Sequence, residues 1–353
     1  MISEPIYILG PCSAESREQV LLTARQLKEV CGDTRFIFRA GVWKARTSPH
    51  TYQGAGEEAL EWLAEVKRTL GMDVATEVAS AEHVEAALKA GIDYLWIGAR
   101  SSANPIAVQE IADAIDRFAV RRETATAVRP ASPVGLLIKN PVNADAALWI
   151  GNIERLEKTG VPVMAIHRGC NHQPCWSMAH EVRLARPDIP MLLDPSHMSG
   201  DATKVPALME KIGELRLDGA MIEVHCNPKE ALSDNAQQIT PSFLRDTLDP
   251  ILSRLCLASL ICPSDGQEEL HWLRAEIDEL DERLWDTIAA RMDVSKRIGE
   301  WKKAHGVAPL QPERYQELRE RIQHTDHFKD SGQKEFALRL WDLIHEQSLK
   351  QQL

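Results

Sequence analysis

The chain has 353 residues, which is enough for two domains, and its apolar fraction of 44% and charged fraction of 26% are ordinary for a folded protein. A net charge of -11 and a pI near 5.6 argue against a general nucleic-acid-binding protein, and no segment approaches the ~18 uncharged apolar residues of a membrane span. Seven cysteines without regular spacing, and an N-terminus without a signal-peptide pattern, favour a cytoplasmic protein that lacks a disulfide framework.

Short apolar runs alternate with stretches of helical periodicity from Ile6 onward, a pattern typical of repeated βα units. We expect strands at residues 6–9, 36–42, 73–78, 94–98, 134–139, 161–167, 191–193 and 220–224. Eight such units predict a closed (β/α)8 barrel, whose ligand site lies at the carboxyl ends of the strands.

Polar side chains follow the predicted strands, as this geometry requires. They are Cys12, Lys44, Arg46, Glu77, Arg100, Lys139, Arg168, His197 and Glu223. The densest group follows the second strand, where Arg39, Lys44 and Arg46 precede Thr47 and predict a pocket for a ligand with several negative charges, such as a phosphorylated substrate. The alternative is that these cations are solvated surface charges, as most lysines and arginines are.

A second set of side chains has the character of metal ligands. It comprises Cys12, His197, Glu223 and Asp234, from three predicted strand ends and one following loop. Each alone could be an ordinary core cysteine or a satisfied polar residue. A thiolate, an imidazole and two carboxylates together suit one borderline divalent metal ion such as Mn, Fe, Co or Zn.

The motifs at 10–16, 39–49, 194–197 and 223–225, with 231–234, resemble in the same order those of 3-deoxy-D-arabino-heptulosonate-7-phosphate (DAHP) synthases. The resemblance implies that Cys12, His197, Glu223 and Asp234 hold the catalytic metal. It also implies that Arg39 and Lys44 bind the carboxylate of phosphoenolpyruvate, and that Arg100, Lys139 and Arg168 bind its phosphate. Arg46 and Thr47 would hold the phosphate of erythrose 4-phosphate, Glu77 would be a further substrate-binding residue, and Lys44 would protonate the new hydroxyl.

Two positions depart from that family's pattern. Ala45 stands where proline is common, and the related 3-deoxy-octulosonate-8-phosphate synthases usually have alanine followed by asparagine there, so Ala45 favours them while Arg46 and Thr47 favour DAHP synthases. Cys226 stands where proline is frequent, and we assign it no role. A Schiff-base aldolase with Lys44 or Lys139 as nucleophile is another alternative, which leaves Cys12 and His197 without a function.

The composition changes after a last barrel helix, expected at 241–260. We place the domain boundary at Cys262-Pro263, so that the barrel occupies 1–262 and a second domain 263–353. The apolar residues Leu273, Ile277, Leu280, Leu284 and Ile288 recur at three- and four-residue steps and predict a helix of about 30 residues, ending near Gly306. Helices at 312–323 and 332–351 follow. Because three helices form a thin core, the apolar stripe predicts dimerisation, and periodicity alone indicates a plain dimerisation module.

The residues of this domain resemble the all-helical chorismate mutases over the whole segment. The matching positions are Leu273, Arg274, Ile277, Asp278, Asp281, Arg291, Met292, Ile298, Gly299, Lys302 and Arg314. The resemblance implies that Arg274 enters the other protomer's site and that Arg291, Lys302, Arg314, Ser348 and Gln352 surround chorismate, without a cofactor. Gln311 and Tyr315 depart from positions where that family often has acids, which weakens the expected contacts to the substrate hydroxyl.

The two resemblances together imply a bifunctional enzyme of the shikimate pathway. The barrel would condense phosphoenolpyruvate with erythrose 4-phosphate, and the helical domain would convert chorismate to prephenate. Since the first strand begins by Ile6, we expect no regulatory segment ahead of the barrel, and we hypothesise that chorismate or prephenate bound at Arg274, Arg291 and Lys302 inhibits it. The alternative is an octulosonate-type barrel whose helical domain is only a sensor or a dimerisation module.

Overall fold

The computed structural model describes residues 5–44, 50–123, 133–247, 266–328 and 330–352. The chain forms two compact units, Met1–Glu276 and Ile277–Leu353, which we describe separately. No helix within the described ranges is long and apolar enough to cross a membrane.

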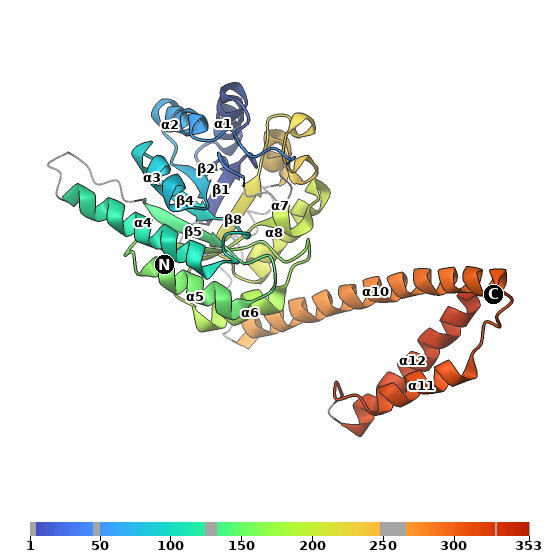
Figure 1. Cartoon of the computed structure of the whole chain (residues 1–353). Helices are drawn as coiled ribbons and strands as arrows, with labels where there is room; N and C mark the ends of the chain where they lie inside the picture. Colours follow the sequence, from blue (N-terminus) through green and yellow to red (C-terminus); the bar gives the residue numbers. More distant parts are fainter. Residues whose placement is uncertain (1–4, 45–49, 124–132, 248–265, 329, 353) are drawn as a thin grey trace. The chain divides into compact units, whose positions relative to one another are not determined.

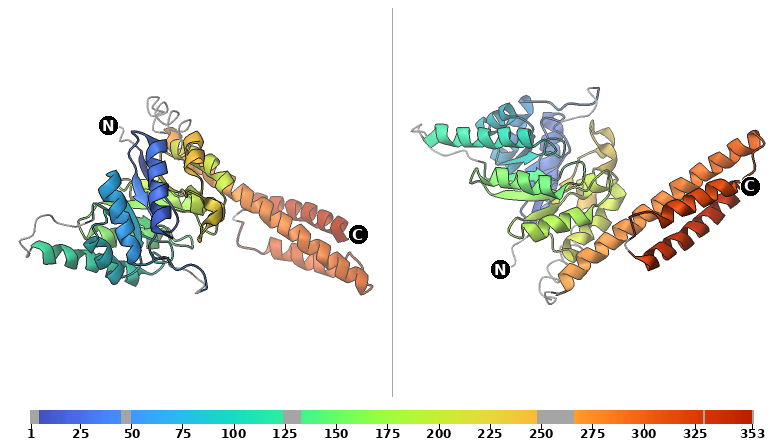
Figure 2. Two further views of the ribbon diagram at one scale, coloured as in Figure 1. Left: turned by 90° about the horizontal axis from the view of Figure 1, so that it is seen from above. Right: turned by 60° about the horizontal axis from the view of Figure 1, so that its bottom comes forward.

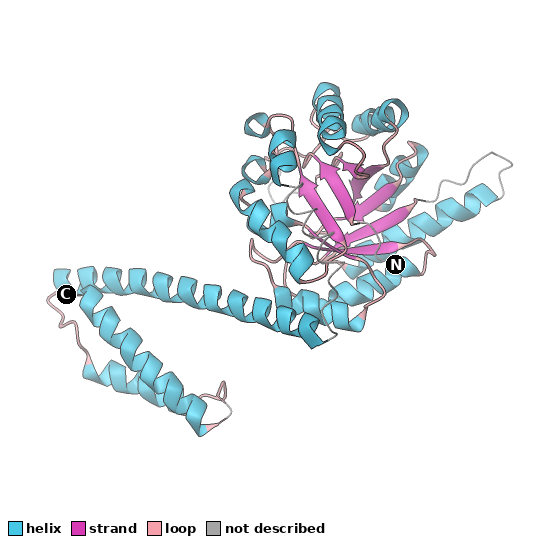
Figure 3. Cartoon of the chain, turned by 180° about the vertical axis from the view of Figure 1, so that it is seen from behind, coloured by secondary structure: helices cyan, strands magenta, loops and turns pink. Residues whose placement is uncertain are grey.

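The first unit is a closed barrel of eight parallel strands in sequential order (Figures 1 and 3). The strands are β1 (Ile6–Gly10), β2 (Ile37–Arg39), β3 (Val74–Val78), β4 (Tyr94–Ile97), β5 (Gly135–Lys139), β6 (Val163–His167), β7 (Met191–Leu193) and β8 (Gly219–Glu223). β1 closes the barrel by pairing with β8, in a register that runs from Ile6 opposite Gly219 to Gly10 opposite Glu223. The predicted barrel is therefore confirmed.

Helices follow the strands and cover the outside of the barrel. They are α1 (Arg17–Cys31), α2 (Glu58–Leu70), α3 (Ala81–Lys89), α4 (Pro105–Glu123), α5 (Ala146–Glu157), α6 (Trp176–Ala185), α7 (Pro195–Ser199) and α8 (Val205–Glu214). Short 3-10 turns occupy Ala202–Lys204, Pro228–Glu230 and Asn235–Gln237. Ser16, Ser80 and Asp145 begin α1, α3 and α5 as side-chain N-caps, which satisfy backbone donors of the first turn. Residues 241–247 of the expected last barrel helix are helical, and the remainder of that prediction falls outside the described residues.

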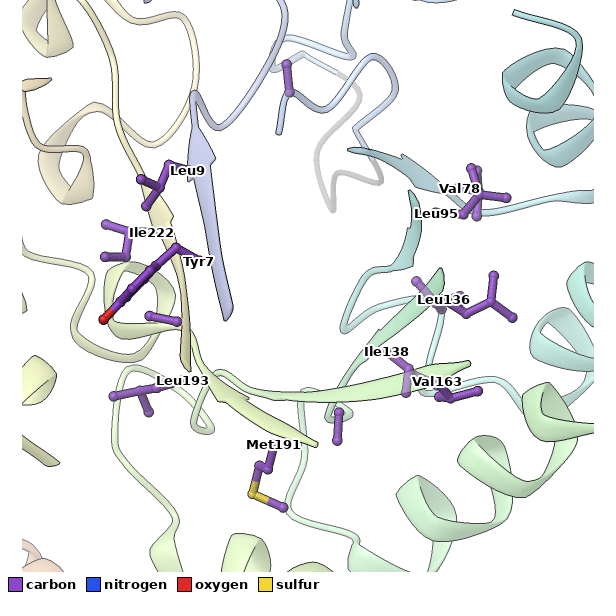
Figure 4. Close-up of a cluster of buried hydrophobic side chains, with 14 of the residues drawn as sticks. Tyr7, Leu9, Val78, Leu95, Leu136, Ile138, Val163, Met191, Leu193 and Ile222 are labelled. Atoms are coloured by element: carbon purple, nitrogen blue, oxygen red, sulfur yellow. The ribbon is translucent and has the colours of Figure 1, made fainter. Parts of the chain in front are cut away.

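Alternate strand residues face two hydrophobic layers. Ile8, Trp96 and Leu137 belong to a small cluster inside the barrel. The intervening positions, such as Leu9 and Leu136, point away from the barrel axis into the larger layer against the helices (Figure 4). With both faces buried, the strands read as continuous apolar runs, and their polar residues are displaced to the strand ends.

The first residues of α10 (Gly266–Ala304) belong to the barrel unit. Trp272, which is 1% exposed, stacks on His180 of α6 with a centroid separation of 5.2 Å and meets Trp176 edge-on at 6.3 Å. Glu276 Oε1 lies 2.8 Å from His180 Nδ1. The predicted boundary at 262–263 lies outside the described residues, whereas the packed unit extends to Glu276.

The second unit contains the remainder of α10 with α11 (Pro312–Gln323) and α12 (Ser331–Gln352). α11 and α12 begin and end within one residue of the predicted positions. α10 is longer than predicted, with 39 residues in place of about 30, because it begins at Gly266, ahead of the apolar stripe. It ends at Ala304, before Gly306, which adopts a left-handed φ of 64°. α11 and α12 lie side by side (Figure 2). Among the described residues α11 has no buried side chain, and α12 buries Ala337 and Ser348.

Candidate active sites

Four side chains with metal-ligand chemistry meet at the carboxyl end of the barrel strands. Cys12 follows β1, His197 lies in α7 directly after β7, Glu223 ends β8 and Asp234 lies in the loop beyond it. Their ligand atoms all lie within 4.8 Å of one another. Cys12 Sγ is 3.0 Å from Asp234 Oδ2, and His197 Nε2 is 3.5 Å from Glu223 Oε1. The structure therefore brings the four predicted ligands together in one cluster.

Neighbouring polar groups fix how these ligands point. Asp194 Oδ2 lies 2.9 Å from His197 Nδ1, which leaves the Nε2 edge of the ring facing the cluster. The Gln237 side chain donates a hydrogen bond of 2.8 Å to Glu223 Oε2. Such outer contacts hold metal ligands in the required orientation before the ion binds.

The cluster fits a divalent cation in both size and chemistry. Bonds of about 2.0–2.3 Å to a central ion place its ligands no more than about 4.6 Å apart, close to the observed spread. Burial, followed by the Glu223 carboxylate, raises the pKa of the Cys12 thiol. Burial also opposes ionisation of Glu223, yet His197 and Arg39 lower the pKa of its carboxyl below the usual value. A bound cation would convert the thiol to the thiolate and neutralise the carboxylates.

Cations surround the cluster in a largely buried layer. Arg39 Nη2 lies 3.1 Å from Glu223 Oε1, and its guanidinium carbon lies 4.7 Å from the centroid of the Trp96 ring. Lys139 Nζ lies 2.6 Å from Asp194 Oδ2, and Arg168 donates to the His197 carbonyl at 3.3 Å. Burial opposes the charge on Asp194, but His197 and Lys139 hold the pKa of its carboxyl well below its usual range. The layer is thus fixed in position and suited to an anionic ligand.

Lys44 connects the cluster to a cavity of about 190 Å³. Its Nζ donates to Cys12 Sγ at 3.0 Å and lies 3.9 Å from Glu77 Oε2. The cavity is lined by Trp43, Lys44, Gln53, Glu77, Ala79 and His83. Gly98 allows Glu77 to occupy this wall, because a Cβ at Gly98 would lie 2.1 Å from Glu77 Oε1.

The structure does not test the predicted phosphate contacts of Arg46, Thr47 and Arg100. Arg46 and Thr47, with Ala45 between them and Lys44, lie outside the described residues. Arg100 follows β4 at the same end of the barrel and is exposed. Their predicted contacts with phosphate groups stay predictions.

In the second unit, four of the predicted residues form two pairs between α10 and α12. Arg291 donates a hydrogen bond to Ser348 Oγ and packs over the Trp341 ring, 4.8 Å from its centroid. Lys302 Nζ donates to Gln352 Oε1 at 2.9 Å. Gly299 permits this close approach, because a Cβ there would lie 2.5 Å from the Gln352 Cα.

Profiles of two protein families match the chain. The DAHP synthetase I family matches residues 3–252, and type II chorismate mutases match residues 273–353. The chain belongs to the DAHP synthetase I family. Its C-terminal segment is a type II chorismate mutase domain. Both resemblances inferred from the sequence motifs are therefore confirmed.

Individual relatives agree with this assignment for the barrel. The phospho-2-dehydro-3-deoxyheptonate aldolase of Thermotoga maritima is 29% identical over 66% of this chain, which spans 64% of that relative's length. A 2-dehydro-3-deoxyphosphooctonate aldolase of Helicobacter pylori is 27% identical over 70% of this chain and 95% of its own length. A crystal structure of the Thermotoga DAHP synthase covers 73% of this chain and 70% of its own, with a TM-score of 0.59 at 25% identity.

Two of the predicted chorismate mutase residues, Arg314 and Arg274, form no hydrogen bond or ion pair in the described structure with Arg291, Lys302, Ser348 or Gln352. Arg314 is exposed and pairs with Glu317 at 2.5 Å. Arg274 is exposed on the part of α10 that belongs to the barrel unit, so its entry into a partner's site stays a prediction. Tyr315, one of the two departures from that family's pattern, donates its hydroxyl hydrogen bond to Asp342 Oδ1 at 2.7 Å.

The sequence motifs assigned no role to several functional neighbours in the DAHP synthetase barrel, although Asp194 and Trp43 lie within the motifs at 194–197 and 39–49. Asp194 and Gln237 orient ligands, and Trp43 with His83 line the cavity. The feature of the sequence that could have identified these residues is their position next to the predicted strands. Asp194 directly follows a strand, Trp43 precedes Lys44, and His83 lies in the first turn of the helix after the strand that carries Glu77.

Proposed function

We propose that the barrel condenses phosphoenolpyruvate with erythrose 4-phosphate, yielding DAHP and phosphate, and that the helical domain converts chorismate to prephenate. The observation that supports the first activity is the buried cluster of Cys12, His197, Glu223 and Asp234 beside the cations Arg39, Lys44, Lys139 and Arg168. The observation that supports the second is the group formed by Arg291, Ser348, Lys302 and Gln352.

A divalent metal held by the cluster would supply a Lewis acid for the aldehyde oxygen of erythrose 4-phosphate. The chain's own cations bind and orient the anionic partner: Arg39 and Lys44 its carboxylate, and Lys139 and Arg168 its phosphate. Planar guanidinium groups suit both anions because they donate parallel hydrogen bonds. Held in this way, the enol carbon of phosphoenolpyruvate can be directed at the aldehyde. One water molecule then adds to the phosphoenol carbon, and phosphate leaves.

Lys44 is suited to proton transfer to the new hydroxyl. Burial opposes the charge on its amine, yet Cys12 and Glu77 raise its pKa above the usual value. An ammonium that stays protonated is a proton donor and a poor nucleophile, which disfavours a Schiff base at Lys44. Burial lowers the pKa of Lys139, so a Schiff base there is disfavoured by geometry alone, because Asp194 holds its amine in an ion pair at 2.6 Å.

The barrel activity is tested by comparing two aldose phosphates. Purified protein is supplied with phosphoenolpyruvate and either erythrose 4-phosphate or arabinose 5-phosphate, with and without a chelator, and phosphate release is followed. We expect preference for the four-carbon sugar and loss of activity with the chelator, recovered by adding Mn, Fe, Co or Zn. Preference for the pentose would identify an octulosonate-type enzyme, and full activity without metal would contradict the proposed chemistry.

The mutase activity requires no nucleophile. The site needs to hold chorismate in its compact conformer and to stabilise charge on the breaking ether oxygen, which Arg291 and Lys302 can do by hydrogen bonding. Burial lowers the pKa of Arg291, and burial together with the charge of Arg291 also lowers the pKa of His345, as expected at a positively charged site.

The test is turnover of chorismate by the full chain. We expect Arg291→Ala to reduce it at least ~100-fold, since it removes a positioned donor to the transition state. Arg297→Ala, an exposed arginine on the same helix, is the matched control and should retain turnover. A domain that binds chorismate without converting it would be a sensor only.

We infer that the protein forms a homodimer or a larger homo-oligomer through the helical domain. Ile277, Leu280 and Trp285 of α10 are 59%, 57% and 64% exposed in the isolated chain. An apolar stripe of this length needs a cover, and a second copy supplies an identical stripe. The same arrangement would allow Arg274 to reach the partner's site.

We also propose that chorismate or prephenate bound in the helical domain inhibits the barrel. α10 supports this proposal because one continuous helix carries Trp272 of the barrel unit and Arg291 of the mutase domain. Inhibition requires a ligand that binds two states of the protein unequally. A chain that ends after Glu276 keeps the packed Trp272 and should be insensitive to both ligands. Inhibition that survives this truncation would contradict the proposal.

A further inference from the structure

Two aromatic side chains that line the cavity beside Lys44, Trp43 and His83, have no role in the proposed reaction. Trp43 and His83 stack face to face, with ring centroids 4.0 Å apart and planes that differ by 2°. Trp43 follows β2 and precedes Lys44, whereas His83 lies in the first turn of α3. The two rings therefore join separate elements of the barrel, and both line the cavity that Lys44 and Glu77 also line.

Backbone hydrogen bonds hold this pair of rings in place. The backbone N–H of His83 donates to Ser80 Oγ, and the N–H of Ala79 donates to His83 Nδ1, both at 3.3 Å. Burial lowers the pKa of His83, which favours the neutral ring. On the other side, Lys44 N–H donates to the carbonyl of Gln53 at 2.9 Å and fixes the chain next to Trp43.

The size of the cavity restricts what enters it. A volume of about 190 Å³ holds about six water-sized groups, which matches the carbon chain of a short polyol. Lys44 and Glu77 offer a donor and an acceptor to its hydroxyls, and Lys44 also contacts Cys12 of the metal cluster. The Trp43 and His83 rings border this space, so they limit the length of chain that it can hold.

We propose that the Trp43–His83 stack determines the chain length of the aldose phosphate that the barrel accepts. This inference rests on the proposed condensation, and it concerns the discrimination between a four-carbon and a five-carbon aldehyde. The ring of His83 acts as a steric wall, and Trp43 positions that wall. His83 is thus a specificity-determining residue and takes no part in bond making.

The experiment compares three variants with the wild type. Removing the wall in His83→Ala should raise the ratio of kcat/KM for arabinose 5-phosphate over that for erythrose 4-phosphate by about tenfold, as for other changes of one group in a pocket. His83→Phe keeps a stacked ring and should stay near the wild-type ratio. His305→Ala removes a comparable stack on Trp301, 4.1 Å between centroids, in the other unit and should also leave the ratio unchanged.

The KM for phosphoenolpyruvate and the chorismate turnover of each variant report whether the protein is folded. The inference would be overturned if His83→Ala left the ratio of the two kcat/KM values unchanged, or if His83→Phe changed that ratio equally. Neither result would contradict the proposed condensation. Loss of activity with both sugars in His83→Ala, with chorismate turnover retained, would also overturn it. A wild-type protein that uses neither sugar would instead reject the proposed condensation.

Discussion

Among the described residues, ion pairs with both side chains buried occur in the barrel unit and not in the helical unit. In the barrel, the side chains of Arg39 and Glu223 are 1% and 0% exposed and lie 3.1 Å apart. In the helical unit, the pair Arg314–Glu317 is 56% and 57% exposed. Removing one partner of a buried pair leaves an uncompensated charge and costs about 3–5 kcal/mol, whereas an exposed pair contributes about 0–1 kcal/mol.

This difference indicates how each active site is completed. The barrel encloses its metal-type cluster with residues of a single chain, because eight strand ends converge on one place. The helical unit leaves Leu280 and Trp285 of α10 exposed and has few buried side chains among its described residues. We therefore expect substitutions in the barrel site to act within one chain, and substitutions on α10 to act through a second copy.

Removing one of the predicted metal ligands should have the largest effect, and it should affect the activity of the barrel alone. Cys12→Ala should abolish metal binding and lower the condensation rate at least ~10³-fold, since loss of a Lewis acid costs several kcal/mol of transition-state stabilisation. Chorismate turnover should be unchanged. Metal content and both activities are measured on the same preparation. Cys31→Ala, a half-buried cysteine at the end of α1, serves as control, and a loss of metal from it would break the comparison.

The proposed dimer is tested with a substitution on α10 of the helical unit. Leu280→Asp places a carboxylate in the expected interface, where an unpaired charge is strongly unfavourable. We expect dissociation of the oligomer in analytical ultracentrifugation and a drop in chorismate turnover of at least ~10-fold, with DAHP formation retained. Glu282→Ala, an exposed position close by on the helix, should leave the oligomer intact. If Leu280→Asp stays oligomeric, the barrel would have to supply the interface.

Most of the barrel could be predicted because its strands are buried on both faces. Seven strands begin and end within about two residues of the predicted positions, since a polar residue follows each apolar run. The second strand is an exception. It was expected at 36–42, but β2 ends at Arg39 because Val42 N–H donates to the side chain of Thr76 in place of a backbone carbonyl.

The cluster of metal-type ligands was predictable for the same reason, because strand order alone brings Cys12, His197 and Glu223 to one end. The contacts of Trp43 with His83, and of Trp272 with His180, were not. Each pairs residues of different elements through ring geometry, which leaves no periodicity in the sequence. Trp272 was also concealed because it adjoins the apolar stripe that begins at Leu273, which alone suggests a dimer interface.

Trp272 at the start of α10 should stabilise the barrel unit, whereas residues further along α10 should not. Trp272→Ala should lower the free energy of unfolding of the barrel by about 3–5 kcal/mol, as for other fully buried tryptophans. The midpoint of urea inactivation of the condensation activity reports this change. Trp301→Ala, at a position 57% exposed, should shift that midpoint much less. Equal shifts in both variants would show that Trp272 is not part of the barrel's packed core.

The smallest effect we predict is a pH dependence of barrel stability. Burial between Trp149 and Trp176 lowers the pKa of His167 to about 3, so the folded protein keeps this ring neutral. The unfolded chain binds a proton there near pH 6.5. Because the unfolded state then holds more protons, the stability from His167 is present above pH 6.5 and is lost as the pH falls toward 3.

His167→Phe removes this titration and keeps an aromatic ring in the same layer. The free energy of unfolding of the wild type, relative to the variant, should fall by about 1.4 kcal/mol for each pH unit below about 6.5, measured by urea unfolding between pH 7.5 and 5. His324→Phe, at an exposed helix end, should run parallel to the wild type throughout this range. If the free energy of unfolding of His167→Phe changed with pH as that of the wild type does, the prediction would be wrong. The pKa of His167 would then have to be the same in the folded barrel as in the unfolded chain.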